Sequence, residues 1–249
     1  MEWLTGIQGR KCRRREQVGN TLRIHGAGIG SMNKEWSELN KTMQTELKKR
    51  GTFNQGIFSL MKLRDELWNT ILSLKNELSS DEFNAIPFIN AEGYHSKTIA
   101  YSLWHVFRIE DIVAHTLVAE DQQVFFKGDY QKRINAPIIT TGNELVKQEI
   151  ADFSKELNLD ELYHYIGEVK DSTEVVLESL SFDDIKKKIS DETKENLRSL
   201  HVVSEDENAV WLIDYWCNKD IRGLIQMPFS RHWIMHLEAC LRIKSKIHT

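Results

Sequence analysis

The stretch SRHWIMHLEACLRIKSKI, from Ser230 to Ile247, places two histidines four residues apart in an apolar run. Its apolar residues recur at helical spacing, so it predicts one long amphipathic helix. On that helix His232 and His236 project to the same side as Met235 and Cys240. This side faces the protein interior, where imidazoles without partners cost free energy. The two histidines therefore need partners inside the fold.

A shared metal ion is one such partner. Residues at i and i+4 of a helix have Cβ atoms about 6 Å apart, so both rings can reach one ion. Two ligands make a weak site, and His105 is the candidate for a third, because it shares a predicted buried stripe with Ile109 and Ile112. The alternative is a set of core histidines that each bond to a backbone carbonyl.

The other histidines and Cys240 are given different roles by their placement. His115 and His164 fall off the buried stripes of their helices and are expected at the surface. His95 precedes the predicted N-cap, Ser96, and is a candidate for the mouth of a pocket. Cys240 lies one turn beyond His236 and is expected as a small buried filler rather than a ligand.

From Asn33 onward the sequence indicates an all-α fold. Its three prolines lie where helices are expected to begin or end, and no alternating stretch is long enough for a sheet. Besides the last helix, apolar spacing predicts helices at about 34–49, 54–78, 96–118, 143–157, 159–180 and 182–200, and one within 204–224 that Gly223 stops.

Composition limits the class of protein. A chain of 249 residues can bury a core that needs neither disulfides nor a metal. The net charge of −4 argues against nucleic acid as the main partner. Three irregularly spaced cysteines favour reduced thiols in a cytoplasm, and no apolar run reaches the roughly 20 residues that cross a bilayer. We therefore expect a cytoplasmic protein with neither nucleic acid nor membrane as a partner.

The N-terminal segment differs from the rest in charge. Residues 1–31 carry a net charge of +4, which leaves −8 for the remainder, and they end in the glycine-rich HGAGIGS. We interpret residues 1–31 as a disordered basic tail or an upstream extension, and residues 32–249 as a single helical-bundle domain. A basic arm that binds RNA or a membrane is the alternative.

Two motifs together resemble the DinB/YfiT-like superfamily: SLWHVFRIEDIV, from Ser102, and much later HWIMHL, from His232. The resemblance covers roughly 53–247. It implies an up-down-down-up four-helix bundle, with His105 on the second core helix and His232 and His236 on the fourth as ligands of a divalent metal. The interval between the motifs is longer than is usual in the family. Extra helices are therefore expected between the second and fourth core helices, within 121–206.

The resemblance also implies a class of function. The metal is expected to be zinc, nickel or iron, and the substrate a small molecule, with a low-molecular-weight thiol among the candidates. A metal with three protein ligands and an open position can lower the pKa of a bound water, which suits hydrolysis. It can also bind a thiol as thiolate, which suits S-transfer. The alternative is a non-catalytic helical module whose metal is structural or absent. A homodimer is compatible with either class.

Glu110 is the candidate for a catalytic base, because it falls on the buried stripe of the His105 helix that contains Val106 and Val113. A buried carboxylate needs a partner or a raised pKa. It can accept a hydrogen bond from an imidazole, or it can pair with an arginine from another helix. The neighbouring Asp111 is expected to point outwards.

Overall fold

The computed structural model describes residues 29–91 and 95–249. This part of the chain is helical and holds no strand, only one isolated bridge between Lys188 and Asp220. The predicted all-α class is confirmed. The first helix, α1 (Ile29–Glu46), begins just before the predicted domain boundary at residue 31, and residues 1–28 of the predicted tail lie outside the described residues.

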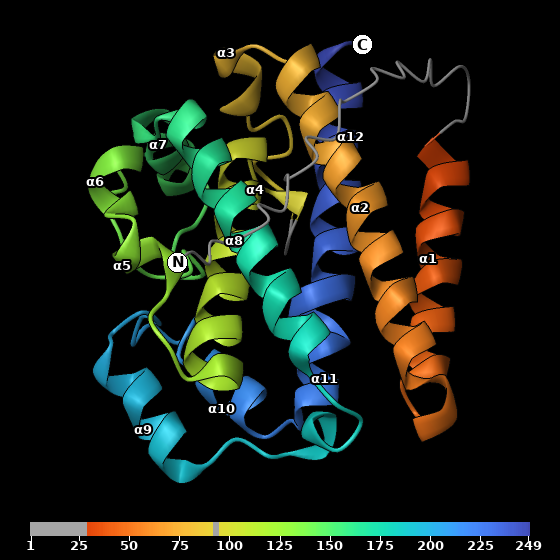
Figure 1. Cartoon of the computed structure of the whole chain (residues 1–249). Coiled ribbons are helices and arrows are strands. Elements are labelled where there is room, and N and C mark those ends of the chain that lie inside the picture. The colour runs from red at the N-terminus through yellow and green to blue at the C-terminus, as the bar shows by residue number, and fades with distance from the viewer. Residues whose placement is uncertain (1–28, 92–94) are drawn as a thin grey trace, which may run out of the picture.

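Four long helices form the centre of the fold: α2 (Phe53–Glu77), α4 (Ile99–Asp111), α8 (Leu159–Ser179) and α12 (His232–Ile247). α4 packs against α8 and α12, and α2 packs against the same two helices, so α2 and α4 lie diagonally across the bundle. In Figure 1, α2 and α12 run upward while α4 and α8 run downward. The segments predicted at 54–78 and 159–180 match α2 and α8 to within a residue.

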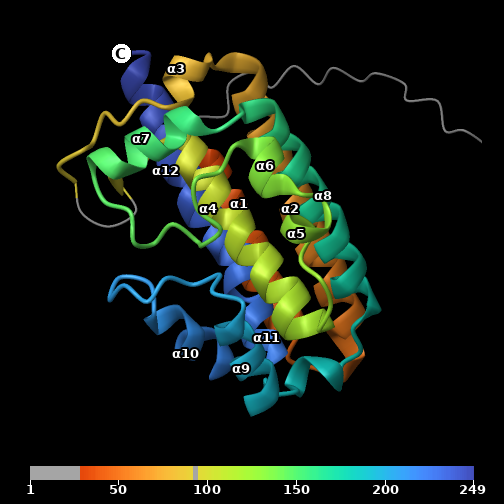
Figure 2. The ribbon, with the colours of Figure 1, turned by 90° about the vertical axis from the view of Figure 1, so that its left-hand side faces the viewer.

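Short helices occupy the connections. η1 (Arg50–Thr52) joins α1 to α2, and α3 (Ser80–Phe83) follows α2. The path from α4 to α8 passes through η3 (Ile112–Ala119), α5 (Val124–Lys127), α6 (Tyr130–Ile134) and α7 (Gln148–Glu156). The path from α8 to α12 contains η4 (Asp184–Lys186), α9 (Asp191–Ser199), α10 (Trp211–Cys217), α11 (Ile221–Ile225) and η5 (Met227–Arg231). Figure 2 shows α9, α10 and α11 together at one end of the bundle. None of the described helices has the length and apolar character that crossing a membrane requires.

Two of the predicted helices are each interrupted. The segment 182–200 divides into η4 and α9, because Ser190 accepts a hydrogen bond from the backbone N–H of Thr193 and starts a new helix. The helix predicted within 204–224 divides into α10 and α11, because Asp220 caps the N–H of Gly223. Gly223 therefore lies inside α11 and does not stop a helix, so this prediction was wrong.

Every residue of α4 is buried, so its charged side chains have partners inside the protein. The prediction that Asp111 points outwards is wrong. Its carboxylate accepts hydrogen bonds from the backbone N–H groups of Val124 and Phe125, at 2.8 and 2.9 Å, and from the Tyr165 hydroxyl at 2.9 Å. Asp111 thus caps the start of α5 and ties it to α8.

Candidate metal centre

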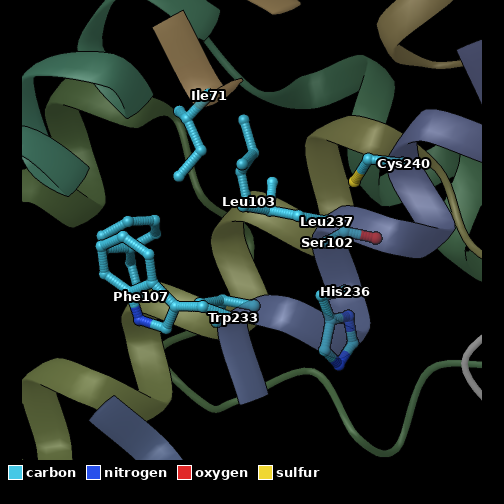
Figure 3. Close-up of a pocket in the computed structure, with 9 residues that line it drawn as sticks. Ile71, Ser102, Leu103, Phe107, Trp233, His236, Leu237 and Cys240 are labelled. Atoms are coloured by element: carbon cyan, nitrogen blue, oxygen red, sulfur yellow. The ribbon is translucent and has the colours of Figure 1, made fainter. Parts of the chain in front are cut away.

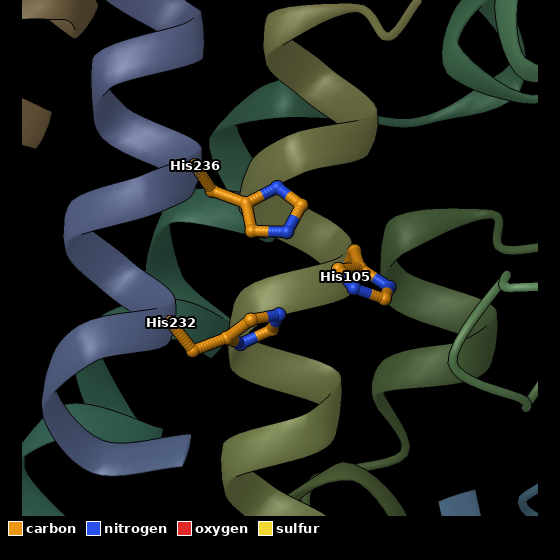
Figure 4. Close-up of side chains that lie close together, drawn as sticks. All are labelled: His105, His232 and His236. Atoms are coloured by element: carbon orange, nitrogen blue, oxygen red, sulfur yellow. The ribbon is translucent and has the colours of Figure 1, made fainter. Parts of the chain in front are cut away.

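Three histidines converge between α4 and α12 (Figure 4). The ring centroid of His105 lies 5.0 Å from that of His232 and 4.8 Å from that of His236, and the last two are 4.6 Å apart. One ligand atom from each ring can be chosen so that all three lie within 4.8 Å of one another. No other group of histidine, cysteine and carboxylate side chains in the described part of the chain is arranged in this way.

Local structure fixes the orientation of His105. Its Nδ1 lies 2.9 Å from the carbonyl oxygen of Thr141, and because a carbonyl can only accept, Nδ1 carries the proton. In a neutral ring this leaves the lone pair on Nε2. Tyr101, one turn earlier on α4, stacks on the imidazole with centroids 5.5 Å apart and planes 11° from parallel, and its hydroxyl donates to the carbonyl of Gly142.

Burial keeps the three imidazoles neutral. They are 6%, 7% and 5% exposed for His105, His232 and His236, and burial lowers the pKa of His105 to about 4. Burial also lowers the pKa of His232 and His236 well below the ordinary value, and the neighbouring histidines add to this effect. Neutral imidazole is the form that binds a metal ion.

The donor set fits a divalent transition metal. Three neutral nitrogen ligands suit zinc, nickel or iron. Nδ1 of His232 is buried and makes no hydrogen bond within the described residues, which is a costly state for a polar atom. A metal ion bound through Nδ1 of His232 would give this nitrogen the partner that it lacks.

The buried imidazoles make the stability of the metal-free protein depend on pH. Their pKa values in the folded state are lowered from 6.5, so below pH 6.5 the unfolded chain binds protons that the folded chain does not. The contribution of these three groups to the free energy of unfolding should be constant above that pH and fall as the pH drops toward about 4, the pKa of His105. Each group adds up to about 1.4 kcal/mol per pH unit.

Urea unfolding between about pH 7.5 and 5, with a chelator present, measures this dependence. His105→Gln should reduce the slope of the free energy of unfolding against pH by the contribution of one imidazole, because glutamine does not titrate. A stability that stays flat over this range would contradict neutral burial of the three rings.

Glu110 follows His105 by five residues on α4, and its carboxylate is bonded to other groups than the histidines. Its two carboxylate oxygens accept hydrogen bonds from Arg64 of α2 at 2.8 and 3.0 Å, and one of them also accepts from the indole N–H of Trp233 at 2.6 Å. The arginine pairing, which was the alternative to an imidazole partner, is the one observed. Because Trp233 adjoins His232 on α12, we assign Glu110 a positioning role.

Arg64 connects all four central helices. Its side chain is fully buried and reaches Glu174 of α8 at 3.1 Å and the carbonyl of Phe229, just before α12, at 3.1 Å. Its guanidinium also lies over the Trp233 ring, 4.5 Å from the centroid. These contacts hold the first turn of α12, which carries His232. The sequence indicates an arginine from another helix as an alternative partner of Glu110, but local patterns do not single out Arg64, because its partners lie on three other helices.

A small cavity adjoins His236 (Figure 3). Cys240 and His236 lie toward one end of it, and Phe107 and Trp233 toward the other. Burial raises the pKa of the Cys240 thiol to about 12, and Cys240 is not among the clustered ligand groups. It is a buried filler, as predicted.

His115 is buried, so its prediction as a surface residue is wrong. It lies in η3, a π-helical segment, where the chain no longer follows the 3.6-residue period on which the surface prediction depended. Its Nδ1 is 2.6 Å from Asp121 and its Nε2 is 3.0 Å from the Ser172 hydroxyl. A catalytic serine needs free backbone N–H groups beside it to stabilise an oxyanion. Ser172 lies inside α8, where the backbone N–H groups already bond within the helix, so it has no such donors. We interpret this trio as a structural link between η3 and α8. His164 is exposed, as predicted.

The fold and the site define an all-α protein with a buried cluster of three histidines. No protein-family model matches the chain, and no curated protein matches it. A function for this chain is therefore inferred from its own residues.

Proposed function

We propose that the chain is a divalent-metal-dependent enzyme of the DinB-like type, which acts on a small molecule as a thiol-dependent S-transferase or a hydrolase. The single observation that carries the proposal is the convergence of three buried, neutral imidazoles from two helices. The order of the helices supports it as well. His105 lies on the second of the four central helices and the pair lies on the fourth, and the helices run as the resemblance implies.

The number of ligands favours an enzyme over a structural metal site. Structural zinc sites use four protein ligands, whereas catalytic sites keep a position open. Within the described residues, no cysteine or carboxylate joins the three histidines as a fourth ligand. The chain is also large enough to fold around its apolar core without an ion.

The residues around the site have distinct tasks in this proposal. A bound ion supplies Lewis-acid chemistry that favours the deprotonated form of a coordinated water or thiol. Thr141 holds the tautomer of His105, and Tyr101 covers one face of its ring. Arg64 and Glu110 position the start of α12 through Phe229 and Trp233.

A screen for thiol conjugation and hydrolysis tests the proposal. The tag-free protein is loaded with zinc, nickel or iron and offered low-molecular-weight thiols with electrophiles, and separately esters and amides. We expect turnover that a chelator removes, that added metal restores, and that His236→Ala lacks. Metal binding without turnover of any offered substrate would favour the non-catalytic module.

A further inference from the structure

We propose that Lys97 binds the carboxylate of the substrate or thiol cosubstrate, so that the site selects small organic acids. This inference rests on the proposed function and names its substrate class. It comes from a half-buried lysine that contacts Tyr101, the residue stacked on His105, and that neither the histidine motifs nor the family resemblance includes.

Lys97 belongs to a column of side chains that ends at the metal ligands. Tyr101 and His105 lie one turn apart on the same face of α4, and Lys97 directly precedes the N-cap of that helix, Thr98. The Lys97 ammonium lies 4.7 Å from the centroid of the Tyr101 ring, and that ring stacks on His105. The ammonium is thus held at the end of the site that adjoins the N-terminus of α4.

Within residues 29–91 and 95–249, no carboxylate pairs with the Lys97 ammonium to balance its charge. Burial alone lowers the pKa of Lys97 to about 8, so most molecules carry a charged Lys97 at neutral pH. A half-buried ammonium without an anion is costly, and a bound anion removes that cost.

Charge balance points to an anionic ligand. Three neutral histidines leave both charges of a divalent ion uncompensated, and Lys97 adds a third positive charge nearby. A thiolate at the metal neutralises one of these charges, and a carboxylate at Lys97 neutralises another. A compact ammonium at the end of a small site suits a single carboxylate.

Binding of two matched thiols to the cobalt-loaded protein tests the inference. 3-Mercaptopropionate and 3-mercaptopropionamide differ only in carboxylate against amide, and absorbance from cobalt–sulfur contact reports binding of either without catalysis. We expect the ratio of the two affinities to fall about tenfold in Lys97→Gln, the size of one charge-assisted contact. Lys97→Arg should keep most of the ratio, since it restores the charge.

Lys127→Gln is the matched control. Lys127 is an exposed lysine at the end of α5, and its removal should leave the ratio unchanged. An unchanged ratio in Lys97→Gln, with cobalt still bound, would overturn the role of Lys97 and leave the proposed function intact. A wild-type protein that binds no cobalt would overturn both. Cobalt content, measured on every variant, separates these outcomes.

Discussion

Replacing His105, His232 or His236 by alanine is expected to abolish stoichiometric zinc binding. The three rings supply every ligand of the candidate site, and two imidazoles alone hold an ion weakly. Loss of a partner that only orients a ligand already lowers metal affinity about 10- to 100-fold, so loss of a ligand should cost more than about 100-fold. Elemental analysis of tag-free protein and competition with a chromophoric chelator measure the effect.

His164→Ala is the matched control for these variants, because its side chain is 61% exposed and far from α12 in sequence. It should bind zinc like the wild type. Zinc should also raise the free energy of unfolding of the wild type, by about 2.7 kcal/mol when its free concentration is 100 times the dissociation constant. It should leave the free energy of unfolding of the three alanine variants unchanged. Equal zinc affinity in the wild type and in all three variants would exclude this metal centre.

Arg64→Met is expected to destabilise the protein by about 3 to 5 kcal/mol. Methionine has an apolar side chain of similar length to that of arginine, so the substitution largely fills the same space. It leaves the Glu110 carboxylate fully buried without its cation. It also removes the contacts with Glu174 and with the carbonyl of Phe229. Urea unfolding followed by circular dichroism measures the loss.

Two comparisons isolate the buried charge as the cause. Arg64→Met combined with Glu110→Gln should be less destabilised than Arg64→Met alone, because no uncompensated charge then remains on Glu110. The ion pair of Arg50 with Asp183 is exposed, at 66% and 61%, so Arg50→Met should cost less than about 1 kcal/mol. If Arg64→Met cost no more than Arg50→Met, the buried network would not hold the bundle together.

The same variant links stability to the site. Arg64 contacts the carbonyl of Phe229 and the ring of Trp233, the residue next to His232. Arg64→Met should therefore also lower zinc affinity under conditions where the variant is still folded. The combined effect would identify the arginine as a positioning residue rather than a ligand.

Much of the fold and the core of the site follow from local sequence. The apolar spacing of 54–78 and 159–180 predicts α2 and α8 closely, since a long amphipathic helix has one periodic face. The same period brings His232 and His236 to one side of α12. It fails at His115, where a π-helical turn shifts the register, and at Ser190 and Asp220, whose caps begin new helices.

The sequence by itself determined that His105, His232 and His236 face the interior, because each lies in a regular helix whose periodicity holds over a few turns. Only the tertiary structure decided their partners. Thr141 fixes His105 from a loop that has no periodic pattern. Arg64 meets Glu110 across the diagonal of the bundle, and Lys97 has no anionic partner among the described residues. These contacts depend on how separate helices pack. Burial by that packing also makes the imidazoles neutral and the charged pairs strong, since charges interact more strongly where water is excluded.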